Sequence, residues 1–173
     1  MALSNLALAA FFVLAPLVLA RHQGATRWGL ILGAQAAGAV AGSAIALRWH
    51  PPRPALVAFL LAIPAGMRLL LLALPLPLWV LVFSSFVATA ALAASAIYWT
   101  ALLQRRIPSA LISRVAAYDS LVSMVFVPIG FAVSGQLASV VGLEVAIVGC
   151  AALAISVNLL AAGLPSIRTL KWN

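Results

Sequence analysis

The chain has 173 residues, of which 66% are hydrophobic and only 7% are charged. A soluble domain carries about a quarter charged residues, so this composition excludes a water-soluble globular domain and predicts an all-α, polytopic membrane protein embedded in a lipid bilayer. The net charge of +8 does not indicate nucleic-acid binding, because the basic residues are scattered singly between apolar runs instead of forming one basic face.

Six segments are apolar over the roughly 20 residues that a spanning helix needs. In chain order they cover residues 3–20, 28–47, 55–74, 78–103, 116–140 and 145–164. The first segment lacks the positively charged start of a signal peptide and is therefore predicted to be a membrane span. The sequence thus predicts one domain, residues 1–173, of six transmembrane helices arranged as two three-helix repeats.

Small residues mark the second segment, which contains Gly33, Gly38 and Gly42. Gly38 and Gly42 form a G-x-x-x-G step, a pattern that lets two helix backbones approach closely in a membrane. The pattern is common in apolar helices, and we expect it to serve packing inside the chain in preference to a dimer contact.

Two polar residues stand out inside the predicted spans. Arg68 is the one basic residue well inside a span, where a charge costs at least ~2.5–3.5 kcal/mol and by default marks a functional site. Because Arg68 lies in the last third of its span, snorkelling towards the far interface is an equal alternative. Asn158, in the sixth span, is expected to form a helix–helix hydrogen bond more readily than a ligand contact.

Orientation follows from the arginines and lysine outside the spans. With six spans both termini lie on one side of the membrane, and Arg21 and Arg27 lie on the other. Because cytoplasmic loops carry the excess of basic residues, both termini are predicted to be cytoplasmic in a multi-pass plasma-membrane protein. The loops on the side of the termini hold seven basic residues, Arg48, Arg53, Arg105, Arg106, Arg114, Arg168 and Lys171.

A basic turn, residues 104–108, separates the fourth and fifth predicted spans and contains Arg105 and Arg106. Asp119 is the only acid on the predicted cytoplasmic side and lies near the start of the fifth span, where a carboxylate meets a favourable helix dipole. Arg114 lies five residues earlier, and Arg105 and Arg106 lie across the turn. An ion pair between Asp119 and one of these arginines is one that two helix arrangements could make or break. A passive helix start is the alternative that the residues alone favour.

The sequence does not predict an enzyme, a metal centre or a bound cofactor. The two acids, Asp119 and Glu144, are predicted on opposite membrane faces, and so are the two histidines, His22 and His50. Neither a carboxylate pair nor a Ser-His-Asp or Cys-His set can assemble from them. The single cysteine, Cys150, lies in an apolar run, so a structural zinc site is not indicated either.

Two stretches resemble a known family, residues 99–120, WTALLQRRIPSALISRVAAYDS, and residues 128–138, PIGFAVSGQLA. They are similar to the junction of the tenth and eleventh helices in the drug:proton antiporter branch of the major facilitator superfamily. The closest group is the exporters related to macrolide-efflux and enterobactin-exporter proteins, also called transmembrane secretion effectors. The resemblance extends over residues 5–170 and is most specific over residues 104–135.

The resemblance implies the C-terminal six-helix half of an efflux permease that exports a small amphipathic compound by alternating access. It implies a second six-helix half, either a separate chain or a second copy, with substrate between the halves. It assigns Arg114 and Asp119 to a cytoplasmic gate, with Arg105 and Arg106 across the turn, and it assigns bending and packing of the fifth span to Pro128, Gly130 and Gly135. The rival expectation is a non-transporting membrane protein, a subunit or remnant that packs on a partner through the Gly33, Gly38 and Gly42 face.

Overall fold

The computed structural model describes residues 2–19 and 24–170, without the side chains of residues 2–8, 109–110 and 122–123. The described chain is all helical and contains no strand. Its helices are α1 (Ala2–Leu19), α2 (Gly24–Arg48), α3 (Pro54–Leu72), α4 (Leu78–Arg106), α5 (Ser109–Val141), α6 (Leu143–Gly163) and the short α7 (Pro165–Arg168).

Five of these helices, α2 to α6, are long and apolar enough to cross a membrane. The all-α prediction is therefore confirmed for the described residues, and the apolar helices are consistent with a membrane-embedded protein. The first predicted span, residues 3–20, corresponds to α1, in which the described apolar part, Ala9–Leu19, is shorter than a span. The described residues thus give five candidate spans and one shorter apolar helix where the sequence predicted six spans.

The connection between α4 and α5 is shorter than the predicted turn at residues 104–108. α4 continues to Arg106 and α5 begins at Ser109, so the polar residues predicted to precede the fifth span, including Arg114, are helical. Pro108 sets the break, because proline lacks an N–H group and holds the preceding residue, Ile107, in an extended conformation with φ −101° and ψ 130°. Arginine is a good helix former, so charge alone does not end either helix.

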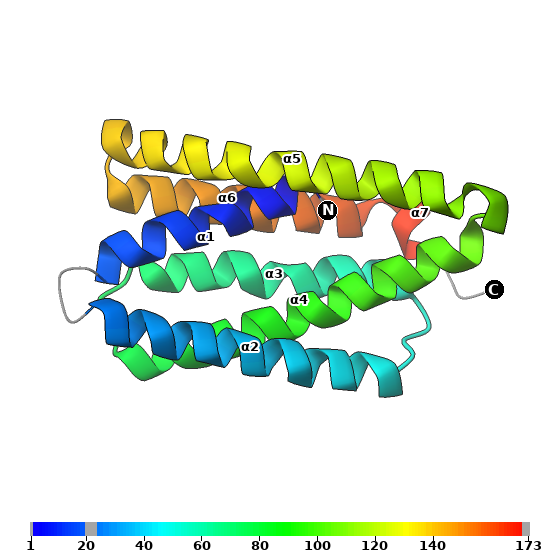
Figure 1. Ribbon diagram of the computed structural model, residues 1–173, viewed down its shortest axis with the longest axis horizontal. Coiled ribbons are helices and arrows are strands. Elements are labelled where there is room, and N and C mark those ends of the chain that lie inside the picture. The colour runs from blue at the N-terminus through cyan, green and yellow to red at the C-terminus, as the bar shows by residue number, and fades with distance from the viewer. Residues whose placement is uncertain (1, 20–23, 171–173) are drawn as a thin grey trace.

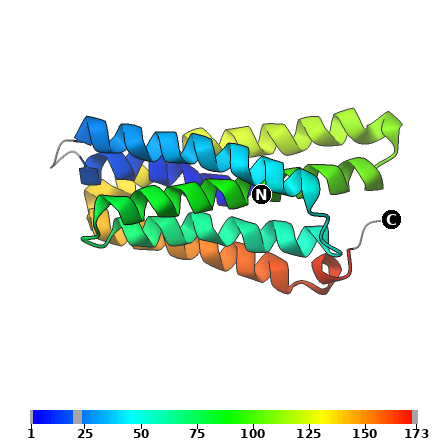
Figure 2. The ribbon, with the colours of Figure 1, turned by 90° about the horizontal axis from the view of Figure 1, so that it is seen from below.

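The helices run alternately in opposite directions along the long axis of the bundle (Figure 1). Seen from below, α2 and α5 lie toward one side, α3 and α6 toward the other, and α1 and α4 between them (Figure 2). α1 packs on α5 and α6, α4 packs on α2 and α3, and α3 packs on α6. Exchanging the first three helices with the last three leaves these contacts unchanged, although the contact of α5 with α6 has no counterpart between α2 and α3.

Close backbone contact joins α2 to α4 at two glycines. Gly38 lies against Phe86 and Gly42 lies against Ala90, so α2 and α4 run in the same direction. A Cβ atom added at Gly42 would stand 2.5 Å from the carbonyl carbon of Ala90, which leaves no room for a side chain. By contrast, a Cβ at Gly33 would meet nothing within 4 Å, so Gly33 does not take part in this contact.

α5 is a single helix through Pro128. The hydroxyl of Ser134 donates to the carbonyl oxygen of Gly130 at 2.6 Å, a bond within the helix of the kind that often accompanies bending. A Cβ at Gly135 would lie 3.9 Å from Cγ1 of Val13 on α1. The α1–α5 contact at Gly135 is therefore ordinary packing and looser than the contact between α2 and α4.

A polar bond joins α3 to α4, and its removal gives a first test of the packing. Ser95 is buried and its hydroxyl donates to the carbonyl oxygen of Ala58 at 2.7 Å. We expect Ser95→Ala to lower the free energy of unfolding by about 0.6–1.7 kcal/mol, the range measured for interhelical bonds in membranes. The measurement is thermal unfolding in detergent, followed by a thiol-reactive dye that labels the buried Cys150 as it becomes exposed.

The matched control for this prediction is Ser84→Ala on the same helix. The Ser84 hydroxyl donates to the carbonyl oxygen of Leu81 within α4, at 3.0 Å, so its removal breaks no contact between helices. An equal loss of stability in both variants would show that the bond from Ser95 to Ala58 does not hold α3 to α4.

Candidate functional site

Arg68 on α3 lies inside the bundle. The side chain is only 2% exposed, and its guanidinium carbon stands 3.6 Å from the centre of the Phe11 ring on α1. A cation held over an aromatic face and shielded from water is stabilised by about 2 kcal/mol or more. The arginine thus stacks on an aromatic ring in the interior of the bundle, and it does not extend towards solvent.

Two of the in-plane N–H groups of this arginine donate no hydrogen bond in the described structure. Nε and Nη1 of Arg68 are both buried and have no hydrogen-bond partner among the described residues. A buried donor without a partner costs about 1–3 kcal/mol, and more when it carries a charge. Within the described part of the chain, then, the guanidinium is an incompletely satisfied buried cation.

Two further polar side chains, on α2 and α4, share this condition. Nε2 of Gln35 on α2 and Oγ of Ser85 on α4 are buried without a hydrogen-bond partner in the described structure. Trp99 also has a buried, unpartnered Nε1, but it follows Ser85 by 14 residues, which places it roughly 21 Å further along α4. Gln35, Arg68 and Ser85 therefore form the group that needs an explanation.

These three residues occupy one level of the bundle. Gln35 lies one helical turn from Ile31, Arg68 one turn from Leu72, and Ser85 one turn from Leu81. The three apolar residues all belong to one buried core cluster, and each polar residue lies on the same side of it. We call Gln35, Arg68 and Ser85 the polar layer, and the core that contains Ile31, Leu72 and Leu81 the apolar cluster.

The contacts between the helices give the same register. The bond from Ser95 to Ala58 ties α4 to α3, which runs in the opposite direction (Figure 1). Ser85 lies ten residues before Ser95 on α4, and Arg68 lies ten residues after Ala58 on α3, so Ser85 and Arg68 are level with each other. Gly38 lies against Phe86, so Gln35 and Ser85 differ in depth by about 3 Å.

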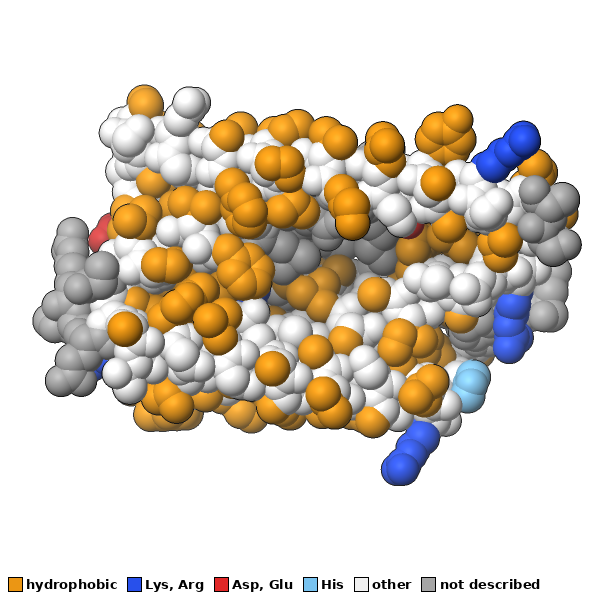
Figure 3. All heavy atoms as spheres, in the orientation of Figure 1, with side chains coloured by type: hydrophobic (Ala, Val, Ile, Leu, Met, Phe, Trp, Pro, Cys, Tyr) orange, Lys and Arg blue, Asp and Glu red, His pale blue; other side chains and the backbone are white. Residues whose placement is uncertain are grey.

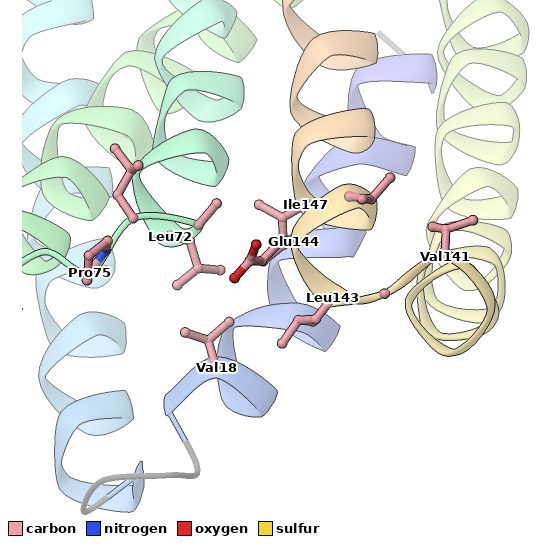
Figure 4. A pocket seen from close by; sticks show the side chains of 11 residues that line it. Val18, Leu72, Pro75, Val141, Leu143, Glu144 and Ile147 are labelled. Atoms are coloured by element: carbon pink, nitrogen blue, oxygen red, sulfur yellow. The ribbon is translucent and has the colours of Figure 1, made fainter.

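The apolar cluster separates the polar layer from the end of the bundle that carries Glu144. Phe11 belongs to this cluster and packs on Trp28, with the ring centres 5.9 Å apart. Beyond it, at the end of the bundle, lies an open pocket of about 670 Å³. Figure 4 shows Leu72 and Ile147, two members of the cluster, at the inner wall of this pocket, with the Glu144 carboxylate beside them.

A hollow lies on the face of the bundle between α5 and the pair formed by α2 and α4 (Figure 3). α4 contacts α5 only weakly, whereas α4 packs closely on α2 and α1 packs on α5. The hollow is therefore bounded by helices from both three-helix units.

The predicted gate residues lie at the opposite end of the bundle from Glu144. Arg105 and Arg106 end α4 and are exposed, Arg114 is exposed on α5, and Asp119 is half-buried one turn further on. Arg114 and Asp119, both described, form no ion pair with each other. Five residues turn a helix by roughly 140°, so the two side chains leave α5 on different faces.

Asn158 is buried in α6, with 1% of its surface exposed. Its Nδ2 donates to the carbonyl oxygen of Ala154 on the same helix at 2.8 Å. Among the described residues, no three histidine, cysteine, aspartate or glutamate side chains lie together in a way that could hold a metal ion.

Sequence reasoning singled out Arg68 but not the polar layer. Ser85 is one of several serines on α4, and Gln35 is a single amide among alanines and glycines. The only sequence signal that connects them is their shared spacing of one turn from an apolar residue.

Comparison with protein-family models, with curated proteins and with solved structures finds no match to this chain.

Proposed function

We propose that the chain is one six-helix half of a membrane transporter of the major facilitator type, which exports a small amphipathic compound by alternating access. The observation that carries this proposal is the repeated contact pattern, in which α1 packs on α5 and α6 as α4 packs on α2 and α3. Helices that alternate in direction make the two units inverted repeats, and such 3+3 repeats are nested within each half of these transporters.

The proposed orientation places the basic end of the bundle in the cytoplasm. The described basic residues gather mainly at one end (Figure 3), where α2, α4 and α6 finish and α3 and α5 begin. Because Arg and Lys are retained on the cytoplasmic side, both chain termini would also be cytoplasmic. The residues at this end are Arg48, Arg53, Arg105, Arg106, Arg114 and Arg168.

A second six-helix bundle, from a separate chain or a second copy, would close on the hollowed face and complete the substrate path. The rival proposal is a non-transporting protein that docks through Gly33, Gly38 and Gly42. Most of that docking surface is already covered. α4 already covers Gly38 and Gly42, and only Gly33 remains open.

Export can be tested in the native host, where any partner half is present. Deleting the gene should increase retention of amphipathic fluorescent dyes, and returning the wild-type gene should restore their energy-dependent efflux. We expect Asp119→Asn to abolish this rescue while membrane insertion stays normal, because the variant removes the half-buried carboxylate proposed for the gate.

The matched control is Glu144→Gln, which makes the same chemical change at the other end of the bundle and should restore efflux. Rescue by Asp119→Asn would reduce Asp119 to an interface anchor. If a correctly inserted wild-type chain changes the efflux of no dye, the transport proposal itself fails.

A further inference from the structure

We propose that the polar layer, Gln35, Arg68 and Ser85, binds the oxyanion head of an amphipathic anion, a carboxylate or phosphate attached to an apolar body. The proposal rests on the proposed function in one respect, because it names the chemical class of the transported compound. The binding itself is a property of the folded chain and can be measured without transport.

The layer contains unpartnered donors of the kind that bind an oxyanion. The guanidinium of Arg68 offers Nε and Nη1, the amide of Gln35 offers Nε2, and the hydroxyl of Ser85 is free to donate, all without a partner among the described residues. Arginine binds carboxylates and phosphates with short, charge-assisted hydrogen bonds that are roughly twice as strong as neutral ones. Because Phe11 occupies one face of the guanidinium, the in-plane N–H groups are the ones left for a ligand.

The charge of Arg68 is not balanced from within the described chain. The two acids of the sequence are Asp119, on α5 at the basic half of the bundle, and Glu144, at the first turn of α6. Glu144 lies beyond the apolar cluster, and neither acid pairs with Arg68 in the described structure. A buried cation is normally paired, so the missing counter-charge points to an anion from outside the chain.

The surroundings of the layer favour a ligand with an apolar body. Phe11, Leu69 and Ile31 are buried next to or one turn from the polar layer, and they present only hydrocarbon. The apolar cluster also separates the polar layer from the pocket at the Glu144 end of the bundle. We therefore expect the anion to place its head at Arg68 and its apolar body along the bundle.

The test uses the purified chain in mild detergent, with octanoate as the probe. A ligand that binds only the folded protein stabilises it by an amount that grows with the logarithm of ligand concentration relative to Kd. The unfolding temperature rises accordingly, and labelling of Cys150 reports that temperature. Octanoate should stabilise the wild-type chain, while methyl octanoate and octyltrimethylammonium should not. Equal stabilisation by octanoate and its methyl ester would overturn the proposal, because the carboxylate would then play no part.

Variants locate the site. Arg68→Met should weaken octanoate binding by at least about tenfold, in line with loss of a buried hydrogen-bonded charge, and Arg68→Lys should retain part of it. Arg27→Gln, which also removes one positive charge, should bind octanoate as the wild type does. If Arg68→Met fails to fold, Gln35→Leu and Ser85→Ala should each weaken binding, with Ser84→Ala as the neutral control. Unchanged binding in the Arg68 variant, or in both of the others, would overturn the proposal.

Two sources of the oxyanion are separated in lipid nanodiscs. If phosphatidylglycerol removes the effect of octanoate and phosphatidylcholine does not, the site takes an anionic lipid headgroup. If octanoate stabilises the chain equally in both lipids, the site takes a free amphipathic anion. Octanoate binding without any dye efflux in the native host would leave the anion site standing and refute the transport proposal.

Discussion

Replacing Gly42 with alanine should lower the free energy of unfolding by about 3 kcal/mol, the upper part of the range for overpacking a well-packed core. A methyl group there would stand 2.5 Å from the carbonyl carbon and 2.6 Å from the Cα of Ala90, and backbone atoms cannot rotate away as a side chain can. To admit the methyl group, α2 must move off α4 along much of their contact. The readout is thermal unfolding in detergent followed by labelling of Cys150.

Gly33→Ala is the matched control, with the same change on the same helix. A Cβ at Gly33 meets nothing within 4 Å, and alanine is favoured over glycine in a helix by roughly 0.5–1 kcal/mol, so this variant should be as stable as the wild type or slightly more stable. Gly38→Ala, which places a Cβ 3.0 Å from the carbonyl carbon of Phe86, should behave like Gly42→Ala. Equal effects at positions 33 and 42 would contradict the described packing of α2 on α4.

The two glycines show how far sequence alone reaches. The G-x-x-x-G step predicts a close helix contact at Gly38 and Gly42, and the preference for packing inside the chain agrees with the structure. The pattern cannot name the partner helix, however, because any helix with small residues could fill that role. It also cannot separate Gly33 from the others, since position 33 is one residue off the four-residue spacing and leaves α2 in a different direction.

Helix ends and side-chain pairs were harder to predict for a related reason. The sequence predicts a basic turn at residues 104–108, whereas α4 continues to Arg106 and only Ile107 and Pro108 separate it from α5. Position along the chain alone does not place Arg114 and Asp119 relative to each other. On a continuous helix the spacing of five residues separates them.

No pattern in the sequence predicts the polar layer. Gln35, Arg68 and Ser85 come from three helices and are distant in sequence. They share a level only because α2 runs along α4 in one direction and α3 runs along it in the other. The hydropathy pattern indicates that burying the charge of Arg68 costs free energy. Only the register between the helices shows that two more unpartnered polar groups lie at the same level.

The second large effect is an expected gain in stability. Arg68→Met should raise the free energy of unfolding by about 1–2 kcal/mol when no anion is added. An arginine inside a membrane span costs ~2.5–3.5 kcal/mol, and stacking on Phe11 returns about 0.5–2 kcal/mol of this. Methionine has a flexible, apolar side chain that fills irregular core space. The measurement is again thermal unfolding reported by Cys150.

Arg53→Met is the control for this gain, because Arg53 is exposed just before α3 begins, and an exposed substitution should change stability by no more than about 0.5 kcal/mol. Saturating octanoate should reduce or reverse the difference in the free energy of unfolding between the wild type and Arg68→Met, because only the wild type gains a counter-ion for Arg68. A site kept at a cost in stability is what selection for binding produces. If Arg68→Met is instead destabilised by several kcal/mol with or without octanoate, Arg68 holds the fold together and the polar layer is structural.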